Sequence, residues 1–149
     1  MPDATSILEA ARVAEWLQLV LNPLAAGGAH RGRAPDEVAE PFIVFANYPG
    51  GAGDTGRMGG YRQWNDSIWL IQAEGIVGPG KPDAPIVACA DAINARLERV
   101  GDPSEAAGPD CTILLAIRQD GDIQDEEVGG ENLMKCRQFF LIRSKRNTA

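Results

Sequence analysis

The fold is decided by the back half of the chain, which opens with the run Ser67-Ile-Trp-Leu-Ile-Gln-Ala73. This run predicts a strand, and the apolar residues in 83–100 recur at helical spacing. Two further apolar runs, 111–118 and 134–143, predict two more strands. The acidic, glycine-containing stretch 120–131 lies between them and is expected to be a loop. The order strand, helix, strand, strand indicates a small α+β unit.

The front half adds a helix and one more strand. Ser6 and Glu9 have the spacing of a capping box, and the apolar residues that follow recur at helical spacing. Residues 41–48 (PFIVFANY) are β-branched and aromatic, which predicts a strand. We therefore expect a single α+β domain over residues 1–149. Its sheet should be mainly antiparallel or mixed, with about four strands, an N-terminal helix and a second helix packed on one face.

Two segments are expected to be flexible. Residues 25–40 read as a linker or extended arm, and residues 49–60 hold six glycines. Both segments are rich in Gly, Ala and Pro and poor in large apolar side chains, so they cannot bury enough surface to order themselves.

The strand around Trp69 is apolar on both faces, since Ile68 and Leu70 alternate with Trp69 and Ile71. A polar face would be expected if one side of this strand met water. The strand is therefore either covered on two sides or part of a subunit contact.

Charge and hydropathy exclude two broad classes of partner. The chain has 14 basic and 21 acidic residues and a net charge of −7. A general nucleic-acid binder needs a basic surface to capture phosphates, so none is expected here. No basic segment precedes the first apolar stretch, and no run has the apolar length of a membrane span, so we expect no membrane partner.

One segment approaches a nucleotide-binding motif. The run Gly75-Ile-Val-Gly-Pro-Gly-Lys-Pro82 fits seven of the eight positions of the phosphate-binding loop. The eighth position should be Ser or Thr, to place a hydroxyl on magnesium, but Pro82 has neither a hydroxyl nor an N–H. We interpret the run as a Gly/Pro crossover loop. A small-ligand or nucleotide-binding α+β module, or an enzyme that uses residues 75–83, stays open as an alternative.

No other residues form a convincing catalytic or metal-binding set. The single histidine, His30, lies in a glycine-rich context that does not fix a catalytic base. Cys89, Cys111 and Cys136 lack metal-ligand spacing and are predicted to be reduced, buried thiols. The consecutive carboxylates 125–127 indicate a solvated or interface charge patch. We expect no enzymatic activity, no catalytic residue, no metal and no cofactor.

Three stretches carry a resemblance to a known family. They are residues 41–48, residues 90–97, and the acidic stretch with Gly129-Gly130 ahead of the strand that ends Phe139-Phe-Leu-Ile-Arg143. Their order resembles the tail terminator (tail completion) proteins of long-tailed bacteriophages. The resemblance implies a structural virion protein of the tail and neck, assembled in the host cytoplasm. The resemblance implies a ring, expected to be a hexamer, that caps the head-proximal end of the tail tube.

The implied partners are further copies of the chain, the tail-tube protein and the head–tail connector or stopper protein. DNA would meet this protein only as the passing genome, without sequence-specific binding. Another neck component of the same virion, such as a head–tail connector subunit, is the alternative.

Ring formation through head-to-tail contacts needs two different complementary surfaces on each subunit. Charge is segregated along the chain, with an acidic stretch at 120–131 and a basic C-terminal end. Pairing within the chain, or plain solvation, is the alternative explanation of these charges, and the aromatic residues are expected in the core or in a subunit contact. The candidate residues for contact with a subunit or partner are Asp54, Arg57, Tyr61, Trp64, Trp69, Asp122, Asp125, Glu126, Glu127, Arg137, Arg143 and Arg146.

Overall fold

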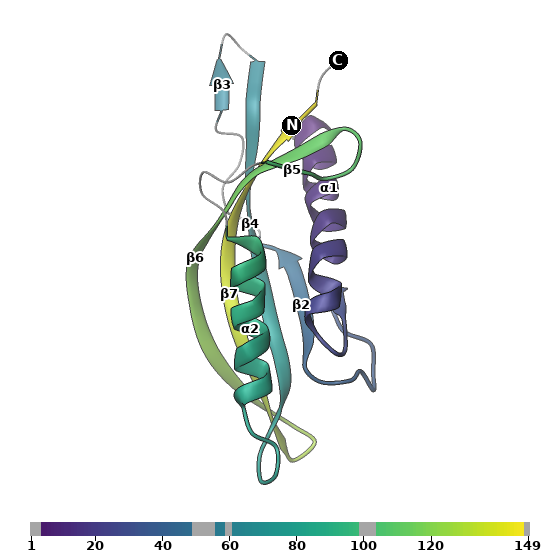
Figure 1. Ribbon diagram of the computed structural model, residues 1–149, viewed down its shortest axis with the longest axis vertical. Helices are drawn as coiled ribbons and strands as arrows, with labels where there is room; N and C mark the ends of the chain where they lie inside the picture. Colours follow the sequence, from purple (N-terminus) through teal and green to yellow (C-terminus); the bar gives the residue numbers. More distant parts are fainter. Residues whose placement is uncertain (1–3, 49–55, 59–60, 99–103, 148–149) are drawn as a thin grey trace.

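The computed structural model describes residues 4–48, 56–58, 61–98 and 104–147. The described residues form two α-helices, a 3-10 turn and seven strands, so the predicted α+β class is confirmed (Figure 1). In chain order these are α1 (Ala4–Leu21), η1 (Asn22–Leu24), β1 (Ala29–Arg31), β2 (Phe42–Asn47), β3 (Gly56–Met58), β4 (Tyr61–Val77), α2 (Ala84–Leu97), β5 (Glu105–Ala106), β6 (Cys111–Val128) and β7 (Glu131–Arg146).

The strands form one mixed sheet in the order β1-β2-β4-β7-β6-β5, with β3 pairing beside this path on β4. β1 and β2 run parallel, and the other neighbours are antiparallel. The predicted sheet of about four strands corresponds to β2, β4, β6 and β7. The predicted number was wrong because β1, β3 and β5 have only two or three residues each, too few to show an alternating pattern.

The acidic stretch 120–131 is not a loop, which corrects the sequence-based prediction. It is the outer part of a long hairpin, in which β6 has 18 residues and β7 has 16. Gly129 and Gly130 join the two strands, with φ of 59° and 81°. Two successive positive φ values are typical of a type I′ turn, whose twist matches that of the strands. Acidic residues are depleted in strands on average, but here backbone pairing with β7 continues to the turn.

Part of the segment predicted as a linker is also in the sheet. β1 lies within residues 25–40, and the side chain of Ala29 is buried. The N–H of Ala29 donates to Asn22 Oδ1 at 3.1 Å, and its carbonyl accepts from Gln18 Nε2 at 2.7 Å. Side chains of α1 and η1 therefore provide hydrogen-bond partners for the backbone N–H and carbonyl of Ala29 in this short strand. Of the second segment, residues 56–58 form β3, and residues 49–55 and 59–60 lie outside the described part.

The core lies between the sheet and the two helices. Trp69 and Ile71 of β4 belong to one buried cluster with Phe140 and Ile142 of β7. The helices add every third or fourth residue: Val13, Leu17 and Leu21 from α1, and Ile86, Cys89, Ile93 and Leu97 from α2. Trp69 is 0% exposed, and its Nε1 donates to Ser67 Oγ at 2.9 Å. This candidate for a subunit contact is therefore a core residue.

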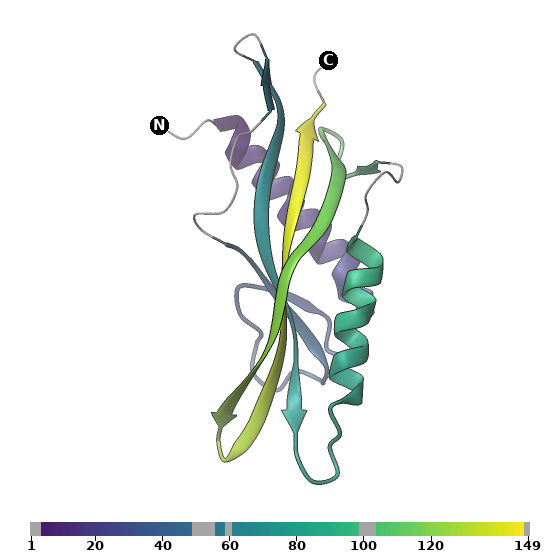
Figure 2. The ribbon, with the colours of Figure 1, turned by 90° about the vertical axis from the view of Figure 1, so that its left-hand side faces the viewer.

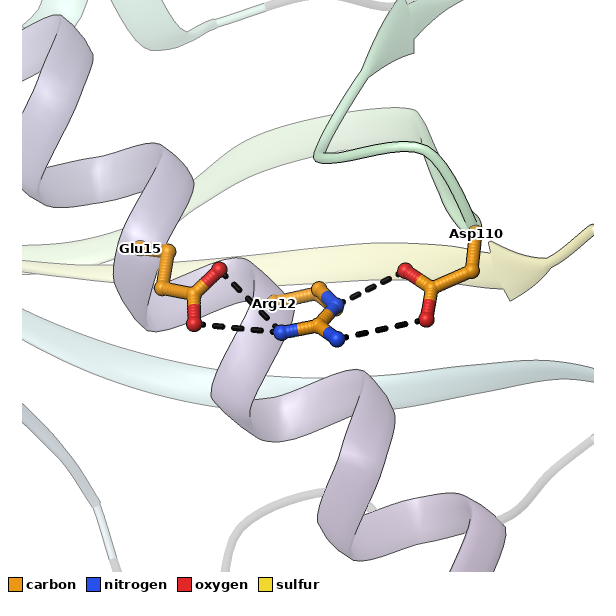
Figure 3. A network of polar contacts seen from close by, with 3 residues as sticks. All are labelled: Arg12, Glu15 and Asp110. Atoms are coloured by element: carbon orange, nitrogen blue, oxygen red, sulfur yellow. Dashed lines mark hydrogen bonds and ion pairs between the residues drawn. The ribbon is translucent and has the colours of Figure 1, made fainter.

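Polar contacts fix α1 against the turn that leads into β6. Arg12 donates from Nε to Asp110 Oδ1 at 2.7 Å and from a terminal nitrogen to Asp110 Oδ2 at 3.3 Å (Figure 3). The other terminal nitrogen lies 3.1 Å from Glu15 Oε1. The hydrogen bond from Arg12 is the main cause that lowers the pKa of Asp110. Nearby, Trp16 Nε1 donates to Glu105 of β5 at 3.1 Å. The helix is thereby joined to the far edge of the sheet.

Candidate interaction surface

The face of the sheet away from α1 is apolar at its centre. In Figure 2, strands β4, β6 and β7 lie in front and α1 lies behind them. Because Trp69 and Phe140 point into the core, their neighbours in the strands point the other way. These neighbours form a contiguous set, since Ile68 pairs with Leu141, Leu70 with Phe139, and Ile117 with Leu141. We call Ile68, Leu70, Ile117, Phe139 and Leu141 the outer patch; all five are partly exposed.

Aromatic and arginine side chains border the outer patch. The ring of Tyr48, an exposed residue, meets Phe139 edge-on, with 5.3 Å between centroids. At one end Arg143 Cζ lies 4.6 Å from the centroid of Trp64, and at the other Arg137 Cζ lies 5.7 Å from that of Phe139. An apolar centre with aromatic and arginine residues around it has the composition of a protein–protein interface.

Each of these arginines is held by a carboxylate of a neighbouring strand. Arg143 donates to both oxygens of Asp66, at 2.7 and 2.9 Å. Arg137 donates to both oxygens of Asp122, at 2.8 Å each, and this hydrogen bonding lowers the pKa of Asp122. The two arginines are thus oriented in advance, which reduces the entropy lost when a partner binds.

The segregated charges proposed as complementary surfaces are largely paired within the chain. Besides the Asp66–Arg143 and Asp122–Arg137 pairs, Lys135 Nζ lies 2.8 Å from Glu126 Oε2. Asp125 accepts a hydrogen bond from Asn132 at 3.2 Å. Glu127 and Arg146 are exposed near opposite ends of the hairpin. The alternative of intramolecular pairing therefore holds for most of these residues.

Three other candidates cannot be placed as side chains. Arg57 and Tyr61 belong to the backbone pairing of β3 with β4, and their side chains lie outside the described part. Asp54 lies outside the described residues altogether. Trp64 is placed at the rim of the outer patch. The structure thus brings Trp64, Arg137 and Arg143 to one surface.

The near-match to a phosphate-binding loop forms a tight turn instead. Its first glycine lies inside β4. Gly78 N–H donates to the carbonyl of Lys81 at 3.0 Å, and Lys81 N–H donates back at 2.9 Å. Ile76 N–H donates to Glu40 Oε2 at 2.8 Å. These amides are engaged within the chain, whereas a phosphate-binding loop directs its amides at the ligand. The geometry favours the crossover interpretation.

The remaining chemistry-bearing residues in the described part of the chain are not grouped into a site. All three cysteines are buried, and burial is the main cause that raises the pKa of Cys89 to about 11. A thiol of that pKa is protonated at neutral pH and is a poor nucleophile. His30 Nε2 lies 2.8 Å from the carbonyl oxygen of Gly27. The described residues contain no group of three or more His, Cys, Asp and Glu side chains that could hold a metal ion. Neither described helix combines the length and apolarity needed to cross a membrane.

A second surface feature, which the sequence reasoning missed, is a groove of about 480 Å³ between α2 and the β6–β7 hairpin. Val87 and Ile123 line it and are both exposed. The sequence predicts a loop for the stretch that contains Ile123, so it does not place this residue opposite α2. Only the pairing of β6 with β7 brings these two residues to one groove.

Comparison of the chain with models of known protein families gives no match, and comparison with curated proteins gives none either.

Proposed function

We propose that this protein is a structural subunit of a bacteriophage virion: a tail terminator that forms a ring at the head-proximal end of the tail tube and meets the head–tail connector. The observation that supports a binding role is the outer patch. An antiparallel sheet with helices on one face commonly presents polar side chains on the other. Here the centre of that face is apolar, and such surfaces are typical of protein-binding sites.

The choice of family rests on the order of elements. The resemblance implies an N-terminal helix, an extended strand, a second strand, a helix and a closing pair of strands. The elements α1, β2, β4, α2, β6 and β7 follow in that order, with the short strands β1, β3 and β5 in addition. The groups that an enzyme would need are not assembled in the described residues, since the glycine-rich turn uses its amides internally and the thiols are buried. A structural role accounts for both features.

We assign the outer patch to the tail-tube protein. A ring held by head-to-tail contacts uses two different surfaces of each subunit for its neighbours. The outer patch lies on the sheet face away from α1. We assign it to a third surface, separate from the two that contact neighbouring subunits. Its preoriented arginines and partly exposed apolar centre suit a flat protein partner rather than a small ligand, which binds in a concave pocket.

The proposal is tested with purified protein and purified tail tubes. Negative-stain electron microscopy should show ring-shaped density at one end of each tube, and native mass spectrometry should show a closed oligomer. The double variant Leu70→Gln, Leu141→Gln should fold and lose tube binding. The control Val128→Gln, at an exposed position near the hairpin turn, should bind like the wild type.

Wild-type protein that never joins tube ends, at any concentration, would contradict the proposed function. Binding to purified connector without binding to tubes would instead support the alternative of a connector subunit. Retained tube binding by the Leu70/Leu141 variant would remove the outer patch from the assignment.

A further inference from the structure

Besides Val128 near the hairpin turn, the described residues have two exposed apolar features outside the outer patch, and they lie on different elements. The first is Leu19 on α1, which is 75% exposed. The second is the groove between α2 and the β6–β7 hairpin. Figures 1 and 2 agree that α1 and the long central part of β6 lie on opposite sides of the molecule. Two different surfaces on opposite sides are what a head-to-tail contact between identical chains needs.

The side chain of Leu19 projects from α1 into solvent. The neighbouring apolar residues Leu17 and Val20 are buried, so Leu19 lies off the core-facing stripe of α1. Glu15 lies one helical turn before it on α1, and Pro23, also exposed, lies four residues after it in η1. These three residues form one narrow, exposed surface, which we call the α1 ridge.

The α1 ridge carries excess negative charge. Glu15 contacts Arg12, but the same guanidinium also binds both oxygens of Asp110 (Figure 3). One cation thus serves two carboxylates. The Glu15 side chain is also largely exposed, so it can take a second cationic partner.

The groove offers apolar walls and an available cation. Val87 and Ala90 of α2 face Ile123 of β6 across it, and Ile123 is 61% exposed. Arg118 lies at the groove and forms no ion pair or hydrogen bond with the described residues. A Cβ atom at Gly121 would lie 2.5 Å from a guanidinium nitrogen of Arg118. The glycine therefore leaves room for the arginine to lie across the strand.

Two of the other charged residues that line the groove form an ion pair with each other, so they are less available to a partner. Asp122 and Arg137 neutralise each other. Among the described residues that line the groove, this leaves Arg118 and Asp91 as the charges without an ion pair. The groove is larger than one leucine side chain, so it can take Leu19 together with the residues beside it on the ridge.

We propose that the α1 ridge of one copy docks in the α2–β6 groove of the next copy, with Leu19 between Val87 and Ile123 and Glu15 against Arg118. This inference rests on the proposed ring and supplies its lateral contact. The contact is heterologous, because ridge and groove are different surfaces, and repetition of one such contact closes a ring when its rotation closes. Opposite charges across the contact fix its register.

The test is charge reversal with rescue, on the full chain. Glu15→Arg and Arg118→Glu should each weaken assembly at least tenfold, measured as the concentration at half assembly by analytical ultracentrifugation. The double variant Glu15→Arg, Arg118→Glu should restore assembly to within about threefold of the wild type, because the pair is re-formed with its charges exchanged. The control Glu127→Arg, an exposed charge near the hairpin turn, should leave assembly unchanged. Circular dichroism melting shows that each variant is folded.

A second measurement does not depend on strong assembly. Copies with Leu19→Cys are mixed with copies with Ile123→Cys under mild oxidation, and disulfide-linked dimers are counted by mass spectrometry. Dimers should form from this mixture and not from Leu19→Cys mixed with Val128→Cys. The docking contact would be overturned if both single charge variants form rings as readily as the wild type and the Leu19→Cys and Ile123→Cys mixture gives no crosslinked dimer. The proposed function would still stand. Both the docking contact and the proposed function would be overturned if the wild-type chain neither assembles nor caps tubes and the cysteine variants give no crosslink.

Discussion

Arg143→Ala should destabilise the fold far more than the geometrically similar change Arg137→Ala. Both arginines donate two hydrogen bonds to an aspartate on a neighbouring strand. The carboxylates differ in burial, because the side chain of Asp66 is 5% exposed and that of Asp122 is 46% exposed. Arg143→Ala leaves a buried carboxylate without its bidentate cation, whereas Arg137→Ala leaves a carboxylate that water can solvate.

The size of the effect follows from this difference. Removing one partner of a fully buried ion pair costs roughly 3–5 kcal/mol. The Arg143 side chain is itself 30% exposed, so we expect a loss of about 2–3 kcal/mol in the free energy of unfolding. For a chain of this length the loss corresponds to a fall of about 4–12 °C in melting temperature. The change for Arg137→Ala should be much smaller, since exposed ion pairs contribute little.

The measurement is urea unfolding followed by circular dichroism, in a double-mutant cycle with Asp66→Asn. The double variant Arg143→Ala, Asp66→Asn should be more stable than the sum of the two single losses implies, because the neutral amide needs no cation. Equal losses for Arg143→Ala and Arg137→Ala, or strict additivity in the cycle, would refute the argument from burial.

Three further predictions concern the region between β4 and α2. Burial is the main cause that raises the pKa of Glu74, so the native state keeps its proton to higher pH than the unfolded chain, and stability falls as pH rises through that range. Glu74→Gln should remove this slope in melting temperatures recorded between about pH 4 and pH 7, and an unchanged slope would contradict it. At Gly75 a Cβ atom would lie 2.9 Å from Ile86 Cγ1, so Gly75→Ala should cost about 1–3 kcal/mol in urea unfolding. Gly78→Ala, with no atom within 4 Å of the added carbon, is its control and should change little. Lys81→Ala should leave melting and assembly unchanged, and saturable ATP binding that disappears in this variant would show that the turn is a nucleotide site after all.

The main elements of the fold could be predicted from the sequence because their apolar patterns are long. The helix at residues 84–97 carries a helical period. The strands that contain Trp69 and Phe140 are apolar runs rich in β-branched and aromatic residues, which predicts strands. The additional strands could not be predicted in the same way. β1 is ordered by pairing with β2, as in Arg31 with Phe45. Glu105 of β5 accepts a hydrogen bond from Trp16, which is far away in sequence.

The candidate surface was predicted in part, and the failures have two physical reasons. The two-sided apolar pattern around Trp69 indicated either a doubly covered strand or a contact surface, and no described helix covers the outer patch. Which charges were available could not be read from composition, because Arg137, Arg143 and Lys135 are neutralised across strands whose register the sequence does not state. Leu19 lay within an amphipathic helix, where one apolar residue off the stripe is an ordinary observation.

The alternation along β7 separates the requirements of folding from those of binding. Residues at even positions from Met134 to Ser144 are buried against the helices, and residues at odd positions from Leu133 to Arg143 face the other way and are partly exposed. A change at Phe140 therefore acts on the core, where removing a large side chain costs roughly 3–5 kcal/mol. A polar change at Leu141, the next residue, alters the outer patch and removes only partly buried surface. Because the two sets share one backbone and one register, a slip of one residue would exchange them and place Arg137 and Arg143 in the core. The cross-strand pairs of those arginines with Asp122 and Asp66 bond correctly only in the observed register, so they hold the outer patch on its face of the sheet.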